Sequence, residues 1–425
     1  MNTKTISKEI NTKAIFIIGV LFFIFGFITW LNGTLIPFLK IICELQTDTQ
    51  AFFVVTASYM AYFFLAIPAS FILKKTGYKN GMAFGLLIMT FGTLIFLPAA
   101  SSRNFSFFLT GLFLQGAGLA LLQTAANPYI SILGPIESAA KRISIMGISN
   151  KLAGVISPLI LSTLLLGNIE SVEKKLINNS SLSEKTLILT ELANKIKVPY
   201  IIMAVILFSL AVLIFRSALP EIRDSKQSNN TSEINATTKS IFYYPHLWLG
   251  VLSIFLYVGT EVLAGDAIGI YGNAMGMPFN ETKYFTSFTL SGMLIGYIFG
   301  ILTIPKYISQ QGALKLCALL GIILSIAIYL TNGYLAIFFI AMLGLSNSLM
   351  WPAIFPLAID GLGSKTKIGA ALLIMGIAGG ALIPLIFATL KHIPHIGYKL
   401  AFFLCIFPAY SIILFFSIKG FKIGK

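Results

Sequence analysis

Long apolar runs, separated by short stretches of charged and turn residues, follow one another along almost the entire chain of 425 residues. Most runs hold about 20 residues, the length that an α-helix needs to cross the hydrocarbon core of a bilayer. The predicted spans are 14–39, 51–73, 81–100, 106–132, 143–167, 199–217, 247–272, 284–305, 314–331, 334–358, 367–390 and 397–418. The pattern therefore predicts an all-α polytopic membrane protein with twelve transmembrane helices.

Two longer polar segments interrupt this rhythm. Residues 168–198 have mixed charge, which predicts an outer loop between the fifth and sixth spans. Residues 218–245 include the run SNNTSEINATTKS, a polar composition that cannot bury a core and is typical of a flexible linker. We expect an N-terminal six-helix half at 1–217, a cytoplasmic linker at 218–245 and a C-terminal six-helix half at 246–425.

Composition and charge agree with a membrane location. Apolar residues make up 57% of the chain and charged residues 11%, against about 45–50% and about 25% in soluble domains. The net charge of +15 comes from basic residues in short loops, so it indicates membrane topology and not nucleic-acid binding. With both termini inside, the inner segments hold 19 Lys and Arg and the outer loops hold 10, which predicts cytoplasmic termini.

Enzymatic chemistry has little support in the sequence. Cys43, Cys317 and Cys405 are isolated from one another, and the three histidines lie near predicted span ends. We therefore predict no disulfide, no metal site, no cofactor and no paired nucleophile and base. The competing class is a polytopic membrane transferase that uses the loop at 168–198, but no set of partner residues stands out there.

Three charged residues fall deep inside predicted spans, away from the span ends, where a charge costs several kcal/mol and indicates a functional site by default. Glu261 lies about 20 Å from the inner end of span 247–272, and Asp266 lies five residues further, roughly 140° around the helix. Both are candidates for binding a coupling cation. Hydrogen bonding to a substrate and a purely structural role are the alternatives for Glu261. For Lys151, inside span 143–167, we favour a structural or ion-pair role.

Neutral polar side chains gather in the first, fourth, fifth and tenth spans. Amides donate and accept hydrogen bonds without charge, which suits a ligand with many hydroxyl groups. No arginine lies deep in a span to hold a carboxylate or phosphate. Hydrogen bonding between helices is the alternative for each amide taken alone. The predicted substrate-binding residues are Asn32, Gln123, Asn127, Asn150, Asn347 and Trp351.

Four stretches carry a resemblance to a known family. They are FFIFGFITWLNGTLIP (22–37), LLQTAANPYISILGP (121–135), ISIMGISNKLAG (143–154) and MWPAIFPLAIDGLG (350–363). They look like the fucose/glucose–galactose branch of sugar:cation symporters in the major facilitator superfamily, and the similarity runs through both halves. The resemblance implies a major-facilitator fold, a monomer in the bacterial inner membrane, and uptake of a monosaccharide with a cation, usually a proton.

Two positions depart from the pattern of the fucose–proton symporter. Gly33 and Gln123 stand where that symporter has an Asp and a Glu that are associated with proton coupling and sugar binding. Gln123 and Glu261 look like the glucose/galactose branch, and Asn150 matches a fifth-span asparagine of the symporter. We therefore expect a glucose/galactose-type hexose. The alternatives are N-acetylglucosamine, fucose or an uncoupled facilitator. Coupling to a proton or sodium would then rest on Glu261 or Asp266.

Overall fold

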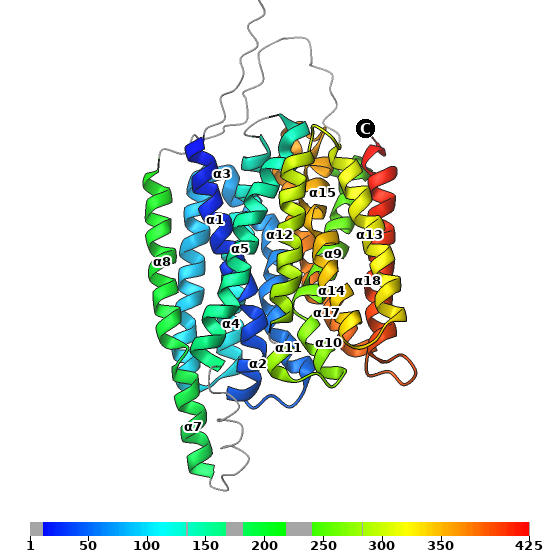
Figure 1. Cartoon of the computed structure of the whole chain (residues 1–425). Coiled ribbons are helices and arrows are strands. Elements are labelled where there is room, and N and C mark those ends of the chain that lie inside the picture. The colour runs from blue at the N-terminus through cyan, green and yellow to red at the C-terminus, as the bar shows by residue number, and fades with distance from the viewer. Residues whose placement is uncertain (1–11, 133–134, 167–181, 218–239, 283, 425) are drawn as a thin grey trace, which may run out of the picture.

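The computed structural model describes residues 12–132, 135–166, 182–217, 240–282 and 284–424. These residues form helices and connecting turns, with no strand among them. The long helices run roughly parallel in one bundle, and the first described helix begins at the same face where the chain ends, the upper face in Figure 1. The predicted all-α polytopic fold is confirmed.

Helices occupy every span that the hydrophobic pattern predicts. Those of the first part of the chain are α1 Thr12–Trp30, α2 Asn32–Ile42, α3 Asp48–Ser102, α4 Phe105–Ile132, η1 Ile136–Ser138, α5 Ala139–Leu166, α7 Leu182–Asn194 and α8 Lys197–Arg216. Those that follow up to residue 359 are η2 Ile241–Tyr243, α9 Pro245–Gly265, α10 Ile268–Ala274, α11 Phe279–Thr282, α12 Phe285–Thr303, α13 Gln310–Leu330, α14 Gly333–Ser348 and α15 Met350–Ile359. The last are η3 Gly363–Lys365, α16 Thr366–Met375, η4 Gly376–Ala378, α17 Gly379–Leu390, α18 Gly397–Ile418 and η5 Gly420–Lys422.

The long element α3 contains two of the predicted spans. Gly77 has φ +77° and ψ 176° inside it, a backbone conformation that is open to glycine and strained for other residues. The 55 residues of α3 are therefore two helices joined at Gly77. This junction separates the two predicted spans, 51–73 and 81–100, which follow each other without an intervening loop.

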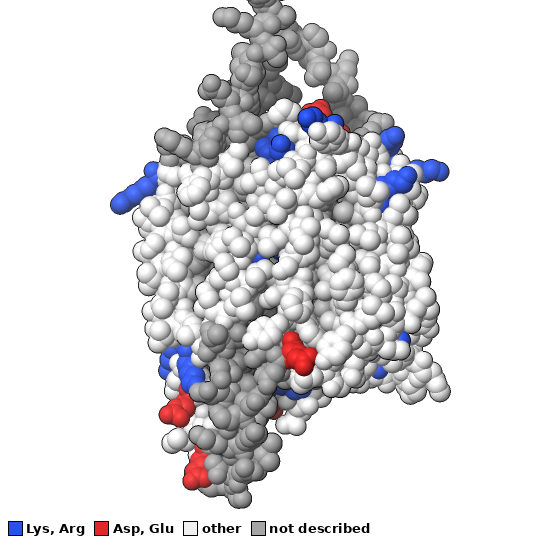
Figure 2. All heavy atoms as spheres, viewed as in Figure 1, with Lys and Arg blue, Asp and Glu red and all other residues white. Residues whose placement is uncertain are grey.

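The outer surface of the bundle is apolar. Among the described residues, ten helices are long and apolar enough to cross a membrane, and Ile15–Trp30 is a shorter apolar helix. Large side chains such as Val205, Ile295 and Ile323 are at least 60% exposed. On the face drawn in Figure 2, most charged side chains lie toward the two ends of the molecule, and the broad band between them shows almost none. Such a band fits a lipid environment, in which apolar side chains face hydrocarbon.

Helices from the two parts of the chain pack directly against each other. α5 lies against α12 and α15, and α3 lies against α16 and α17. The core is thus continuous across the chain. The predicted linker at 218–245 falls mostly outside the described residues, and the division into halves at 1–217 and 246–425 stays a prediction.

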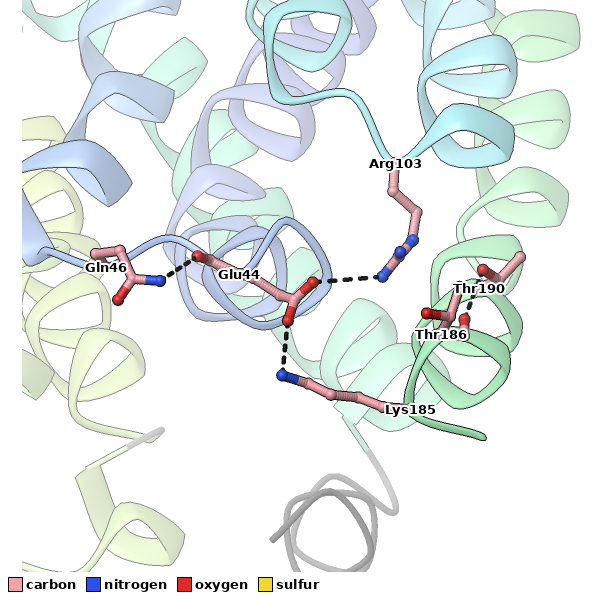
Figure 3. Close-up of polar contacts among 6 residues, drawn as sticks. All are labelled: Glu44, Gln46, Arg103, Lys185, Thr186 and Thr190. Carbon is pink, nitrogen blue, oxygen red and sulfur yellow. Dashed lines mark hydrogen bonds and ion pairs between the residues drawn. The ribbon is translucent and has the colours of Figure 1, made fainter. Parts of the chain in front are cut away.

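A charged group ties three helix ends together at the lower end of the bundle (Figure 3). The Glu44 carboxylate, just after α2, lies 2.8 Å from Lys185 Nζ on α7 and 3.9 Å from an Arg103 guanidinium nitrogen at the end of α3. The side chains of Glu44 and Lys185 are 46% and 40% exposed. This group therefore lies in contact with solvent, unlike the charges inside the bundle.

Candidate functional site

A cavity of about 100 Å³ lies inside the helix bundle, between helices of residues 12–166 and helices of residues 245–390. Side chains from α1, α3, α4 and α5 line one side of it, and side chains from α9, α12, α15 and η4 line the other. The lining residues are Phe22, Phe25, Thr29, Trp30, Tyr59, Tyr62, Gln123, Ile143, Gly147, Asn150, Lys151, Tyr257, Val258, Glu261, Tyr297, Trp351 and Ile377. Most of them are aromatic or neutral and polar.

An ion pair crosses the cavity. Lys151 Nζ on α5 lies 2.5 Å from Glu261 Oε1 on α9, and the two side chains are 6% and 11% exposed. The same ammonium group lies 4.3 Å from the ring centroid of Trp30, at the end of α1. Burial makes this cation–π contact stronger than one at a surface. The only charges that line the cavity within the described residues thus neutralise each other.

Close packing on both sides fixes the position of Trp30. A Cβ atom added at Gly154 would lie 2.5 Å from the Trp30 ring, and one added at Gly265 would lie 2.7 Å from it. Such distances are too short for any side chain, so both positions require glycine. The indole is therefore held between α5 and α9, directly beside the ion pair.

A chain of hydrogen bonds links three helices beside the cavity. Gln123 Nε2 donates to the Tyr62 hydroxyl at 3.0 Å. One turn along α4, Asn127 Nδ2 donates to the Gln123 carbonyl oxygen, and Asn127 Oδ1 accepts from Trp351 Nε1 on α15 at 3.2 Å. Asn127 is fully buried, so this bond joins α4 to α15 without water. Gln123 and Trp351 are themselves among the residues that line the cavity.

The predicted site residues fall into three groups. Gln123, Asn150, Trp351 and Glu261 line the cavity. Asn127 supports it through Trp351, and Asn150 also donates to the Phe22 carbonyl oxygen at 3.2 Å.

The other three predicted residues lie elsewhere. Asn347 is fully buried outside the cavity lining and accepts a hydrogen bond from Tyr410 at 2.9 Å. Asp266 is buried just beyond α9 and is not among the lining residues. Asn32 begins α2, but its side chain lies outside the described residues.

Sequence reasoning missed four tyrosines that line the cavity: Tyr59, Tyr62, Tyr257 and Tyr297. A tyrosine inside an apolar span carries a hydroxyl group that needs a partner, which is the signal that could have identified them. Together with Trp30 and Trp351 they form an aromatic wall. The wall and the amides offer stacking faces and neutral hydrogen-bonding groups, which suits an uncharged polar ligand.

Several helices are interrupted next to this cavity. α9 ends at Gly265, just after Glu261, and α10 begins at Ile268. α15 begins just before Trp351, and η4 carries Ile377 between α16 and α17. Interrupted helices at the junction of two repeats are typical of substrate sites in secondary transporters.

Comparison with known proteins agrees with this architecture. A sequence profile of the Major Facilitator Superfamily matches residues 18–388. The chain is 32% identical to a glucose/galactose transporter of Brucella abortus, over 99% of this chain and 97% of that protein. It is 28% identical to the L-fucose-proton symporter of Escherichia coli, over 85% of this chain and 83% of that protein.

A solved structure shows the same fold. The crystal structure of an Escherichia coli fucose:proton symporter variant matches with a TM-score of 0.78 and 25% identity, over 97% of this chain and 98% of that chain. The chain therefore belongs to the major facilitator superfamily, in the branch that includes glucose/galactose transporters and fucose–proton symporters, and it is a polytopic membrane transporter.

Proposed function

We propose that this transporter imports a neutral monosaccharide of the glucose/galactose type together with a proton, by alternating access. The observation that carries the proposal is the cavity between the two parts of the chain. Its two charges cancel within the Lys151–Glu261 pair, and most of the remaining lining residues are aromatic or neutral and polar. The names of the relatives, glucose/galactose transporter and L-fucose-proton symporter, support a sugar as the ligand.

The chemistry of the lining matches a pyranose ring. Trp30, Trp351 and the tyrosines can stack on its apolar faces, while Gln123 and Asn150 can hydrogen-bond to its hydroxyl groups. Gly33 and Gln123 replace two acids of the fucose–proton symporter pattern, which favours a glucose/galactose-type hexose over fucose. N-acetylglucosamine remains the second candidate, because carriers of the same branch look similar around residues 350–358.

Transport requires the cavity to open. Its volume of about 100 Å³ is below the roughly 300 Å³ at which typical ligand pockets begin. We infer that the two halves rock apart around the cavity to admit sugar from one side and release it to the other. Sugar and cation must each favour one orientation for uptake to be coupled.

The proposed setting is the bacterial inner membrane. The transporter would act there as a monomer. Both termini would be cytoplasmic, because the inner segments hold more Lys and Arg than the outer loops. In that orientation the lower face of Figure 1 is outside. Coupling to the cation would rest on the acids of the α9 region, Glu261 and Asp266.

Uptake in proteoliposomes tests the function. Labelled glucose, galactose, N-acetylglucosamine and fucose would be supplied with and without an inward proton or sodium gradient. We expect glucose and galactose to accumulate above equilibrium with the proton gradient. Equilibration without accumulation would indicate a facilitator. Absence of uptake for all four sugars would contradict the substrate class.

A matched pair of tryptophan variants tests the cavity. Trp351→Ala removes a stacking face and the hydrogen bond to Asn127, and we expect KM to rise about tenfold or more, equivalent to about 1.4 kcal/mol of binding energy. Trp248→Ala is the control, because Trp248 stacks on Phe242 away from the cavity. Equal effects of the two substitutions would contradict a sugar site at Trp351.

A further inference from the structure

A buried carboxylate in the bundle has no hydrogen-bonding partner among the described residues. Asp266 directly follows the last residue of α9, and it is 7% exposed. Neither of its carboxylate oxygens makes a hydrogen bond to any described residue. An ionised carboxylate in such a place costs several kcal/mol, because neither water nor a partner compensates its charge.

Glu261, five residues earlier, is in the opposite situation. Its carboxylate lies 2.5 Å from the Lys151 ammonium group, so its negative charge is compensated inside the protein. Both groups lie close enough to Asp266 to act on it electrostatically. The Glu261 charge disfavours a second negative charge at Asp266, while the positive charge of Lys151 is already paired.

The backbone around Asp266 adds to this effect. Asp266 lies at the C-terminal end of α9, where the helix dipole disfavours negative charge. The carbonyl oxygens of Ala264 and Gly265 accept hydrogen bonds from the hydroxyl groups of Thr289 and Thr286, at 2.8 and 2.7 Å. Because these oxygens are engaged, a metal cation would find few free ligands beside the carboxylate. A single proton on Asp266 neutralises the group without any further ligand.

We propose that Asp266 holds the coupling proton, while Glu261 stays ionised in its pair with Lys151. The inference rests on the proposed function. It assigns proton binding to Asp266 and the ion pair with Lys151 to Glu261. The titratable groups that face Asp266 are Glu261 on α9, Lys151 on α5 and Tyr59 on α3.

The position of Asp266 fits proton entry from outside. α10 and α11, which follow Asp266 in the chain, lie at the lower face in Figure 1, the outer face in the proposed orientation. Asp266 takes one proton from water on that side. Sugar binds the protonated form more tightly, and the proton leaves to cytoplasmic water after the sugar.

Infrared spectroscopy tests the protonation state without any sugar. At neutral pH the purified wild-type protein should show the carbonyl band of a protonated carboxylic acid. The band should disappear in Asp266→Asn. It should remain in Lys151→Met/Glu261→Gln, which removes the ion pair without leaving Lys151 unpaired, and in Asp360→Asn, the same chemical change at an exposed aspartate. A wild-type protein without the band, or a band that persists in Asp266→Asn, would overturn the proposal.

Transport assays test the coupling itself, with labelled galactose as the probe. Asp266→Asn should exchange sugar across the membrane but lose gradient-driven accumulation at least tenfold, together with sugar-induced proton uptake. Lys151→Met/Glu261→Gln, which removes both charges of the pair, should keep proton uptake per sugar, even where its sugar affinity falls. Accumulation retained in Asp266→Asn would refute the assignment, and so would accumulation in the wild type that follows sodium instead of protons.

The two measurements separate the inference from the function on which it rests. If no sugar is transported but the infrared band depends on Asp266, the proposed substrate is wrong and the proton site stands. If sugar accumulates with protons but the band is independent of Asp266, the function stands and the proton site is wrong.

Discussion

Two groups of opposite charges join helices in this protein, and they differ in their surroundings. Lys151 and Glu261 lie inside the bundle, 2.5 Å apart and about nine-tenths buried. Glu44 meets Lys185 and Arg103 at the lower end of the bundle (Figure 3), where Glu44 and Lys185 are nearly half exposed. The chemical groups are similar, but water competes only at the second place.

Burial of the charges, and not the presence of an ion pair as such, sets how much stability is lost when one partner is removed. An exposed pair contributes about 0–1 kcal/mol, because water solvates each charge when the pair breaks. Removing one partner of a buried pair costs about 3–5 kcal/mol, because the remaining charge has no water to solvate it. Loss of one partner is therefore far more destabilising at the buried pair than at the exposed group.

The largest expected effect comes from removing one buried partner. Lys151→Met leaves Glu261 unpaired, and we expect the free energy of unfolding to fall by about 3–5 kcal/mol. Lys185→Met, with the same side-chain change at the exposed group, is the control. Thermal unfolding of the purified proteins in detergent measures both. Similar shifts for the two variants would show that burial does not separate the two groups.

A smaller effect is expected when both buried charges are removed together. In Lys151→Met/Glu261→Gln no buried charge is left without a partner, so most of the stability lost in Lys151→Met should return. A double-mutant cycle of unfolding free energies measures the coupling. If the double variant is as unstable as the sum of the two single variants, the two side chains do not act as a pair.

The smallest effect is expected at the exposed group. Glu44→Gln should lower stability by no more than about 1 kcal/mol. Salt screens exposed charges over about 8 Å at physiological ionic strength, so this difference should shrink further in high salt. Unfolding of wild type and variant at low and high salt provides the test. A large effect that is insensitive to salt would place Glu44 among the buried charges.

Much of the fold could be predicted from the sequence. Apolar runs of span length located the helices, because a membrane requires about 20 apolar residues for each crossing. The exceptions are breaks within spans, such as the one between α14 and α15. Such breaks depend on packing against neighbouring helices, which a local pattern does not contain.

The candidate site could be predicted only in part. Gln123 and Asn347 are both amide residues inside apolar spans. Gln123 lines the cavity, whereas Asn347 accepts a hydrogen bond from Tyr410 elsewhere. Which side of a helix faces the cavity depends on how the helix is rotated against its neighbours. The four tyrosines of the cavity wall were missed for a related reason. A hydroxyl group inside an apolar span signals the need for a partner, but not whether the tyrosine faces the cavity.

The sequence by itself determined the membrane location, the helical class and the presence of acids where charge is costly, because these follow from hydrophobicity and length. Only the tertiary structure decided which acid has a partner. Lys151 and Glu261 are 110 residues apart in the chain and meet across the cavity, whereas Asp266, five residues further along, meets no partner among the described residues. Burial and pairing arise when distant helices pack together, and they set the cost of each charge.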